Sequence, residues 1–82
     1  MSTKIYEILL KNKDNFINVL YTTRTYAIYG GRTSWNNILN MYFSGMYQEC
    51  LYIIQDSWPN NKKKVQAVTS LKIIIQCYDN LD

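Results

Sequence analysis

The side chains that could do acid–base, nucleophilic or metal chemistry are few and scattered along the chain. The 82 residues include six carboxylates and two cysteines, but no histidine. Glu49 and Asp56 could share one helix face, although a solvated face explains their spacing equally well. Cys50 and Cys77 cannot complete the usual four-ligand zinc site without histidine, and neither has the neighbouring base that nucleophilic catalysis requires. The sequence therefore predicts no enzyme, no metal site and no cofactor.

One glycine-rich stretch, Gly30-Gly31-Arg32-Thr33-Ser34, precedes a predicted helix. It lacks the spacing and the lysine of a phosphate-binding loop. Weak anion binding at the following helix N-terminus is one interpretation. The favoured interpretation is that the glycines end one helix and that Thr33 or Ser34 caps the next.

The second chemical feature is basic. Lys62, Lys63 and Lys64 fall in the first turn of a predicted helix, where the helix dipole disfavours positive charge. They are therefore not expected to stabilise that helix. Together with Arg24 and Arg32 they could form a face that contacts phosphate or nucleic acid. A solvated lysine run is the slightly favoured alternative, because the pI is only about 8.9 and no nucleic-acid-binding signature is visible.

The third feature is aromatic. The stretch from Thr33 to Trp58 has no Lys or Arg, and fourteen of its twenty-six residues are apolar or aromatic. Two Trp and eight Tyr are more than a small interior can enclose with every polar ring atom satisfied. A single aromatic residue is more often buried than exposed, but for the set we expect some exposed rings, which are enriched in protein interfaces. The predicted protein-binding residues are Trp35, Tyr42, Met46, Tyr47 and Trp58.

Hydrophobic spacing predicts helices at both ends of the chain. The polar run of residues 11–15 either ends the first helix or lies on its exposed side. Residues 16–29 are ambiguous, because nine of the thirteen from 17 to 29 are Ile, Val, Thr or Tyr, which favours a strand. Helical spacing of Phe16, Val19 and Leu20, with Asp14 as a potential N-cap, favours a helix, which is our prediction.

In the second half of the chain, Ser44-Gly45 is expected to kink a helix or to split it into a helical hairpin. Pro59 should end the next helix, and Asn60-Asn61 should make the turn and cap the last one. The sequence thus predicts a single all-α domain over residues 1–82, a bundle of four to five helices with antiparallel neighbours. The alternative is an α+β fold in which residues 16–29 form a strand.

Size and hydropathy constrain the class of protein further. The longest apolar run is the five residues Cys50 to Ile54, against roughly 20 for a membrane span. The N-terminus has charges where a signal peptide would be apolar. We therefore expect a cytoplasmic protein. A chain this short buries only ~60% of its unfolded surface, so a homodimer is expected as an additional source of stability.

The amino-acid composition of the chain is also distinctive. Ile, Lys, Asn and Tyr, which have AT-rich codons, make up 34 of the 82 residues. In this composition, in length and in the absence of catalytic motifs, the chain resembles the small accessory proteins of T-even-type phages. These include a cytoplasmic lysis-inhibition protein that assists the antiholin, and inhibitors of host proteins. The resemblance implies a non-enzymatic regulator that binds a protein target, such as the cytoplasmic part of a membrane protein. A small basic regulator that binds RNA or DNA is the alternative.

Overall fold

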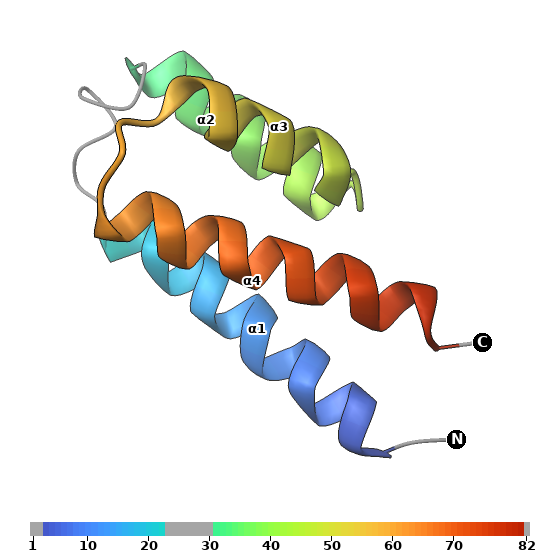
Figure 1. Cartoon of the computed structure of the whole chain (residues 1–82). Coiled ribbons are helices and arrows are strands. Elements are labelled where there is room, and N and C mark those ends of the chain that lie inside the picture. The colour runs from blue at the N-terminus through green and yellow to red at the C-terminus, as the bar shows by residue number, and fades with distance from the viewer. Residues whose placement is uncertain (1–2, 23–30, 82) are drawn as a thin grey trace.

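The computed structural model describes residues 3–22 and 31–81, which form four α-helices. These are α1 (Thr3–Thr22), α2 (Gly31–Phe43), α3 (Tyr47–Ser57) and α4 (Lys62–Asp79), with short turns between α2 and α3 and between α3 and α4 (Figure 1). The described residues contain no strand, so the prediction of an all-α bundle is confirmed. In the ambiguous segment, residues 16–22 belong to α1, whereas residues 23–29 lie outside the described residues.

Helix α1 runs without interruption through the polar residues 11–15. Leu9, Phe16 and Leu20 recur at i, i+7 and i+11 and are all buried, so one face of the helix is anchored in the core on both sides of the polar run. The polar run itself lies on the exposed and half-buried sides of α1. Asp14 is therefore an interior helix residue, and its predicted role as an N-cap is wrong.

The Ser44-Gly45 sequence splits the central apolar region into two helices rather than kinking one. Gly45 has a φ of 82°, the left-handed conformation that glycine adopts without a Cβ clash. The backbone N–H of Met46 donates to the Met41 carbonyl (2.8 Å) and that of Gly45 to the Tyr42 carbonyl (3.1 Å). This pair of bonds is a Schellman motif, which satisfies the last carbonyls of α2.

The start of α2 and the turn before α4 test two further predictions. Helix α2 begins at Gly31, so Thr33 and Ser34 lie within its first turn and the prediction that one of them is the N-cap is wrong. Between α3 and α4 the prediction is confirmed. Helix α3 ends just before Pro59, and the Asn61 side chain accepts a hydrogen bond from the backbone N–H of Lys64 at 3.0 Å, which caps α4.

Consecutive helices are antiparallel, and α4 packs against both α1 and α3, while α2 packs against α3 (Figure 1). All four helices contribute to one core. Its buried apolar residues are Leu9, Phe16, Val19, Leu20, Ile38, Tyr42, Cys50, Leu51, Ile54, Trp58, Ala67, Leu71, Ile74 and Cys77.

The helices differ in length, and this gives the bundle an open end. Helices α1 and α4 have 20 and 18 residues, whereas α2 and α3 have 13 and 11. At 1.5 Å per residue the first pair is roughly 10 Å longer than the second. The α2–α3 turn stops short of the end of the bundle at which both termini lie, and α1 and α4 continue past it (Figure 1).

Candidate functional site

The five residues predicted to bind a protein do not form one surface. Tyr42 and Trp58 are only 5% and 3% exposed and belong to the core. Trp35 is half-buried, and its indole Nε1 donates to the Leu20 carbonyl at 3.2 Å. Tyr47 is also half-buried, which leaves Met46, at 43%, as the one member with a largely exposed side chain.

Five exposed large apolar side chains, Met46 among them, belong to the helix segments and the turn near the open end. Tyr6 and Leu10 lie on the first half of α1, Phe43 and Met46 flank the α2–α3 turn, and Tyr78 lies on the last turns of α4. Their exposed fractions run from 39% for Tyr78 to 69% for Phe43. We call these five residues the open-end surface. Of these five residues, Met46 alone was predicted from the sequence as a protein-binding residue.

A chain of ring contacts connects this surface to the core. Phe16 stacks on Tyr42 with ring centroids 4.8 Å apart, and Tyr42 meets Phe43 edge-on at 5.3 Å. Tyr42 also meets Tyr47 edge-on at 5.4 Å, and Tyr47 stacks almost parallel on Tyr78 at 5.4 Å. Contacts of this kind add about 0.5–1.5 kcal/mol per pair beyond simple burial. The exposed rings of Phe43 and Tyr78 are therefore held in place by residues that the core fixes.

Lys13 adds one positive charge beside these rings. Its Nζ lies 5.1 Å from the centre of the Tyr78 ring and 5.8 Å from that of Tyr47, within the range of a cation–π contact. A hydrogen bond with Tyr78 raises the pKa of Lys13, and the same bond lowers the pKa of Tyr78. Burial raises the pKa of Tyr47, and burial raises that of Tyr42 to about 12.

Two lysines of the run Lys62–Lys64 make hydrogen bonds to neighbouring helices, and these contacts, not α4 itself, explain their positions. The Lys64 Nζ donates to the Gln55 carbonyl of α3 at 2.7 Å and to the Asn60 Oδ1 at 3.2 Å. The Lys63 Nζ donates to the Thr22 Oγ1, at the last residue of α1, at 3.4 Å. Both ammonium groups therefore lie at the carbonyl-rich, negative ends of neighbouring helices.

The remaining predicted basic residues are not brought into this cluster by any described contact. Lys62 is exposed. Arg24 lies outside the described residues, as does the side chain of Arg32. The structure therefore gives two of the five predicted anion-contact residues a role inside the bundle.

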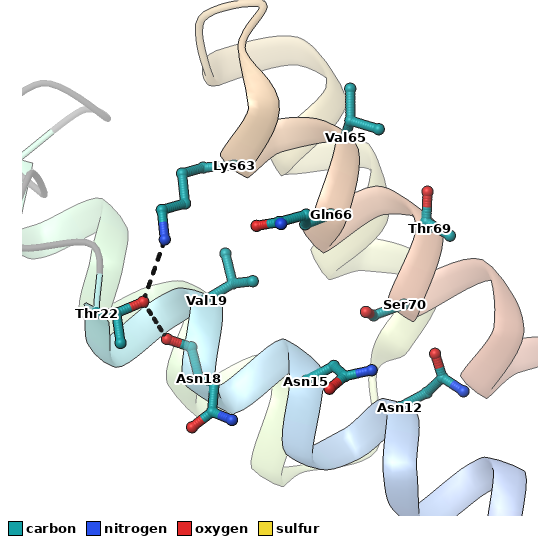
Figure 2. Close-up of a pocket in the computed structure, with 10 residues that line it drawn as sticks. All are labelled: Asn12, Asn15, Asn18, Val19, Thr22, Lys63, Val65, Gln66, Thr69 and Ser70. Atoms are coloured by element: carbon teal, nitrogen blue, oxygen red, sulfur yellow. Dashed lines mark hydrogen bonds between the residues drawn. The ribbon is translucent and has the colours of Figure 1, made fainter.

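A polar groove of about 490 Å³ runs between α1 and α4 (Figure 2). Helix α1 lines it with amide and hydroxyl side chains, and α4 lines the opposite side with similar groups and Lys63. The amide and hydroxyl residues in its wall are Asn12, Asn15, Asn18, Thr22, Gln66, Thr69 and Ser70. Sequence analysis missed this groove, because its two walls come from segments more than forty residues apart.

The described residues give little support for catalytic or metal chemistry. They contain no group of three or more His, Cys, Asp or Glu that could hold a metal ion. Burial raises the pKa of the Cys50 thiol to about 11, and its Sγ donates to the Ile38 carbonyl at 3.4 Å. A buried neutral thiol packs as a small apolar group and does not act as a nucleophile at neutral pH. None of the helices in the described part of the chain is long and apolar enough to cross a membrane.

Comparison with known proteins adds no assignment: no protein-family model, no curated protein sequence and no solved structure matches this chain. The surfaces described above are therefore the basis on which a function can be argued.

Proposed function

We propose that this chain is a non-enzymatic regulator that binds a protein target and modulates it in stoichiometric amounts. The observation that carries the proposal is the open-end surface, where Tyr6, Leu10, Phe43, Met46 and Tyr78 are each at least 39% exposed. Two of them, Phe43 and Tyr78, are fixed by the ring contacts to the core, and the Lys13 Nζ lies 5.1 Å from the centre of the Tyr78 ring.

The size of this surface fits a protein partner. From their exposed fractions, the five side chains present on the order of 600 Å². A standard protein–protein interface buries about 800 Å² on each partner, and an apolar patch of several hundred Å² on a monomer is often an interaction site. Aromatic residues with little conformational freedom are also the typical centres of such interfaces. A second copy of the chain, as expected for a homodimer, or a different protein would use the same chemistry.

The resemblance to small accessory proteins of T-even-type phages extends this proposal to lysis inhibition or to the inhibition of a host protein. A target of this kind includes the cytoplasmic part of a membrane protein. Binding of RNA or DNA is the weaker candidate, because Lys64 already donates to the Gln55 carbonyl and to the Asn60 Oδ1 within the bundle.

Affinity capture with a matched pair of variants tests the proposal. The double variant Tyr6→Ser/Phe43→Ser removes two exposed rings from the open-end surface. The control Tyr52→Ser removes a ring of similar exposure, 56%, from α3. We expect the wild type and the control to capture the same protein from the native host and the double variant to lose it. Sedimentation of the same samples shows whether the captured protein is a second copy.

Two results would contradict the proposal. One is retention of the partner by the double variant with an unchanged circular dichroism spectrum. The other is binding that weakens steeply between about 50 and 200 mM salt, which is typical of phosphate contacts and not of apolar association.

A further inference from the structure

The flank of α1 that borders the groove has an unusual composition. Asn12, Asn15, Asn18 and Thr22 recur at i, i+3, i+6 and i+10, so they form one strip along the helix. Asn and Thr are poorer helix formers than Ala or Lys by several tenths of a kcal/mol each. This strip therefore does not serve the stability of α1 through helix propensity.

Helix α4 presents matching groups across the groove. Gln66, Thr69 and Ser70 lie opposite the α1 strip (Figure 2), and Ser70 at 5% and Val19 at 6% exposure form its floor. Amides and hydroxyls can both donate and accept hydrogen bonds. A wall of such groups is complementary to a ligand whose own groups both donate and accept hydrogen bonds. Neighbouring hydroxyls on a sugar have this property.

Internal hydrogen bonds fix the orientation of side chains at both ends of the groove. The Asn12 Nδ2 donates to the Ile8 carbonyl at 2.8 Å, which leaves the Asn12 Oδ1 as an acceptor. The Thr22 hydroxyl donates to the Asn18 carbonyl and accepts from Lys63. Groups held in this way lose less conformational freedom when a ligand binds.

The lining also excludes other ligand classes. The described residues that line the groove include no carboxylate, which argues against a cation or a metal ion, and no aromatic ring on which a planar base would stack. Of the lining residues in the described part of the chain, Val19 and Val65 are the apolar ones, too few for a hydrophobic ligand. Lys63 is the one charged group among the described lining residues, and the 3.4 Å bond from this lysine to Thr22 is long enough for an anionic oxygen to replace it readily.

From these contacts we propose that the α1–α4 groove binds a small polyhydroxylated ligand that carries an anionic group, such as a sugar phosphate, with the anionic group at Lys63. Its volume of about 490 Å³ lies within the range of about 300–1,000 Å³ for small-molecule sites. The site does not depend on the open-end surface and stands or falls separately from the proposed function.

Amide chemical shifts in ¹⁵N-labelled protein test the assignment. The probes are glucose 6-phosphate, ribose 5-phosphate and glycerol 3-phosphate. Glucose alone and inorganic phosphate alone serve as controls for the hydroxyl part and the anionic part of the ligand. A polar ligand of this size is expected to bind with a Kd of about 1 mM. At least one of the three phosphates should shift the groove residues, while glucose should shift the same residues about tenfold more weakly. Absence of shifts with all three, or equal shifts with inorganic phosphate alone, overturns the proposal.

Two variants locate the site. Lys63→Gln should weaken binding of the responding phosphate about tenfold, since a charge-assisted hydrogen bond is lost. Lys72→Gln removes an exposed lysine from the same helix outside the groove and should leave binding unchanged. Asn15→Leu replaces an amide in the middle of the α1 strip by a better helix former and should abolish binding without loss of helix content. Equal effects of the two lysine variants would also overturn the proposal.

Discussion

Replacing Lys64 by Met tests whether the lysine run stabilises neighbouring helices. The variant keeps most of the apolar stem and the helix propensity but removes the ammonium group. The lost contacts are the 2.7 Å bond to the Gln55 carbonyl and the 3.2 Å bond to the Asn60 Oδ1. We expect Lys64→Met to lower the free energy of unfolding.

The magnitude follows from two opposing effects. A hydrogen bond from a charged group contributes about 1.5–3 kcal/mol when well shielded, and less for a half-buried group such as Lys64. Removing the charge also relieves the unfavourable interaction with the N-terminus of α4, about 0.3–1 kcal/mol. The net loss is therefore about 1 kcal/mol. For 82 residues the unfolding entropy is roughly 170 cal/mol/K, so the melting temperature should fall by about 6 °C.

Thermal unfolding followed by circular dichroism measures this change, and Lys62→Met is the matched control. Lys62 has the same relation to the N-terminus of α4 but is fully on the exposed side. Its replacement should leave the melting temperature unchanged or slightly higher. If the two variants change the melting temperature by the same amount, the contacts of Lys64 with α3 do not stabilise the bundle and our interpretation of the lysine run is wrong.

Three further predictions concern the turn, the tyrosines and the thiol. Gly45→Ala should lower the free energy of unfolding by about 1 kcal/mol in a urea titration, because Ala is strained at a φ of 82° while nothing lies within 4 Å of the added Cβ; an unchanged midpoint would show that the turn relaxes. In an absorbance titration Tyr78 should ionise before Tyr42, whose pKa is about 12, and Lys13→Met should raise the pKa of Tyr78. Because the pKa of Tyr42 in the unfolded chain is about 10, its contribution to stability is complete below pH ~10 and is lost as the pH rises through about 12; stability that is constant across this window would contradict the burial of its hydroxyl. Cys50, with a pKa of about 11 and full burial, should resist thiol reagents at pH ~8 until the protein unfolds, and rapid labelling of the folded protein would disagree with its position in the core.

Local signals in the sequence were enough to locate the boundaries between α2 and α3 and between α3 and α4. Pro59, the Asn61 cap and the Ser44-Gly45 break each act through atoms a few residues away, so a short window of sequence contains the whole cause. The same holds for the apolar spacing that gives α1 its buried face. Where a local signal was misleading, as with Asp14, packing of the helix on both sides of it outweighed the preference of one side chain for a cap.

The functional surfaces depended on distant parts of the chain. Trp58 and Phe43 are both large, apolar and close to a helix end, yet one is 3% exposed and the other 69%. The difference arises because Trp58 lies where α3 and α4 meet, while Phe43 lies where α2 stops short of α1 and α4. Nothing within a few residues of either ring distinguishes them.

By itself, then, the sequence determined that the described part of the chain is helical, where α2 and α3 end and which face of α1 is buried. Only the tertiary structure decided which rings stay exposed and what the lysines contact. From the sequence, Lys63 and Lys64 were not expected to stabilise α4, because only the dipole of their own helix was considered. The antiparallel arrangement brings the ends of α1 and α3 to the same place. There the Thr22 hydroxyl and the Gln55 carbonyl accept hydrogen bonds from the two ammonium groups, whose charge the start of α4 disfavours.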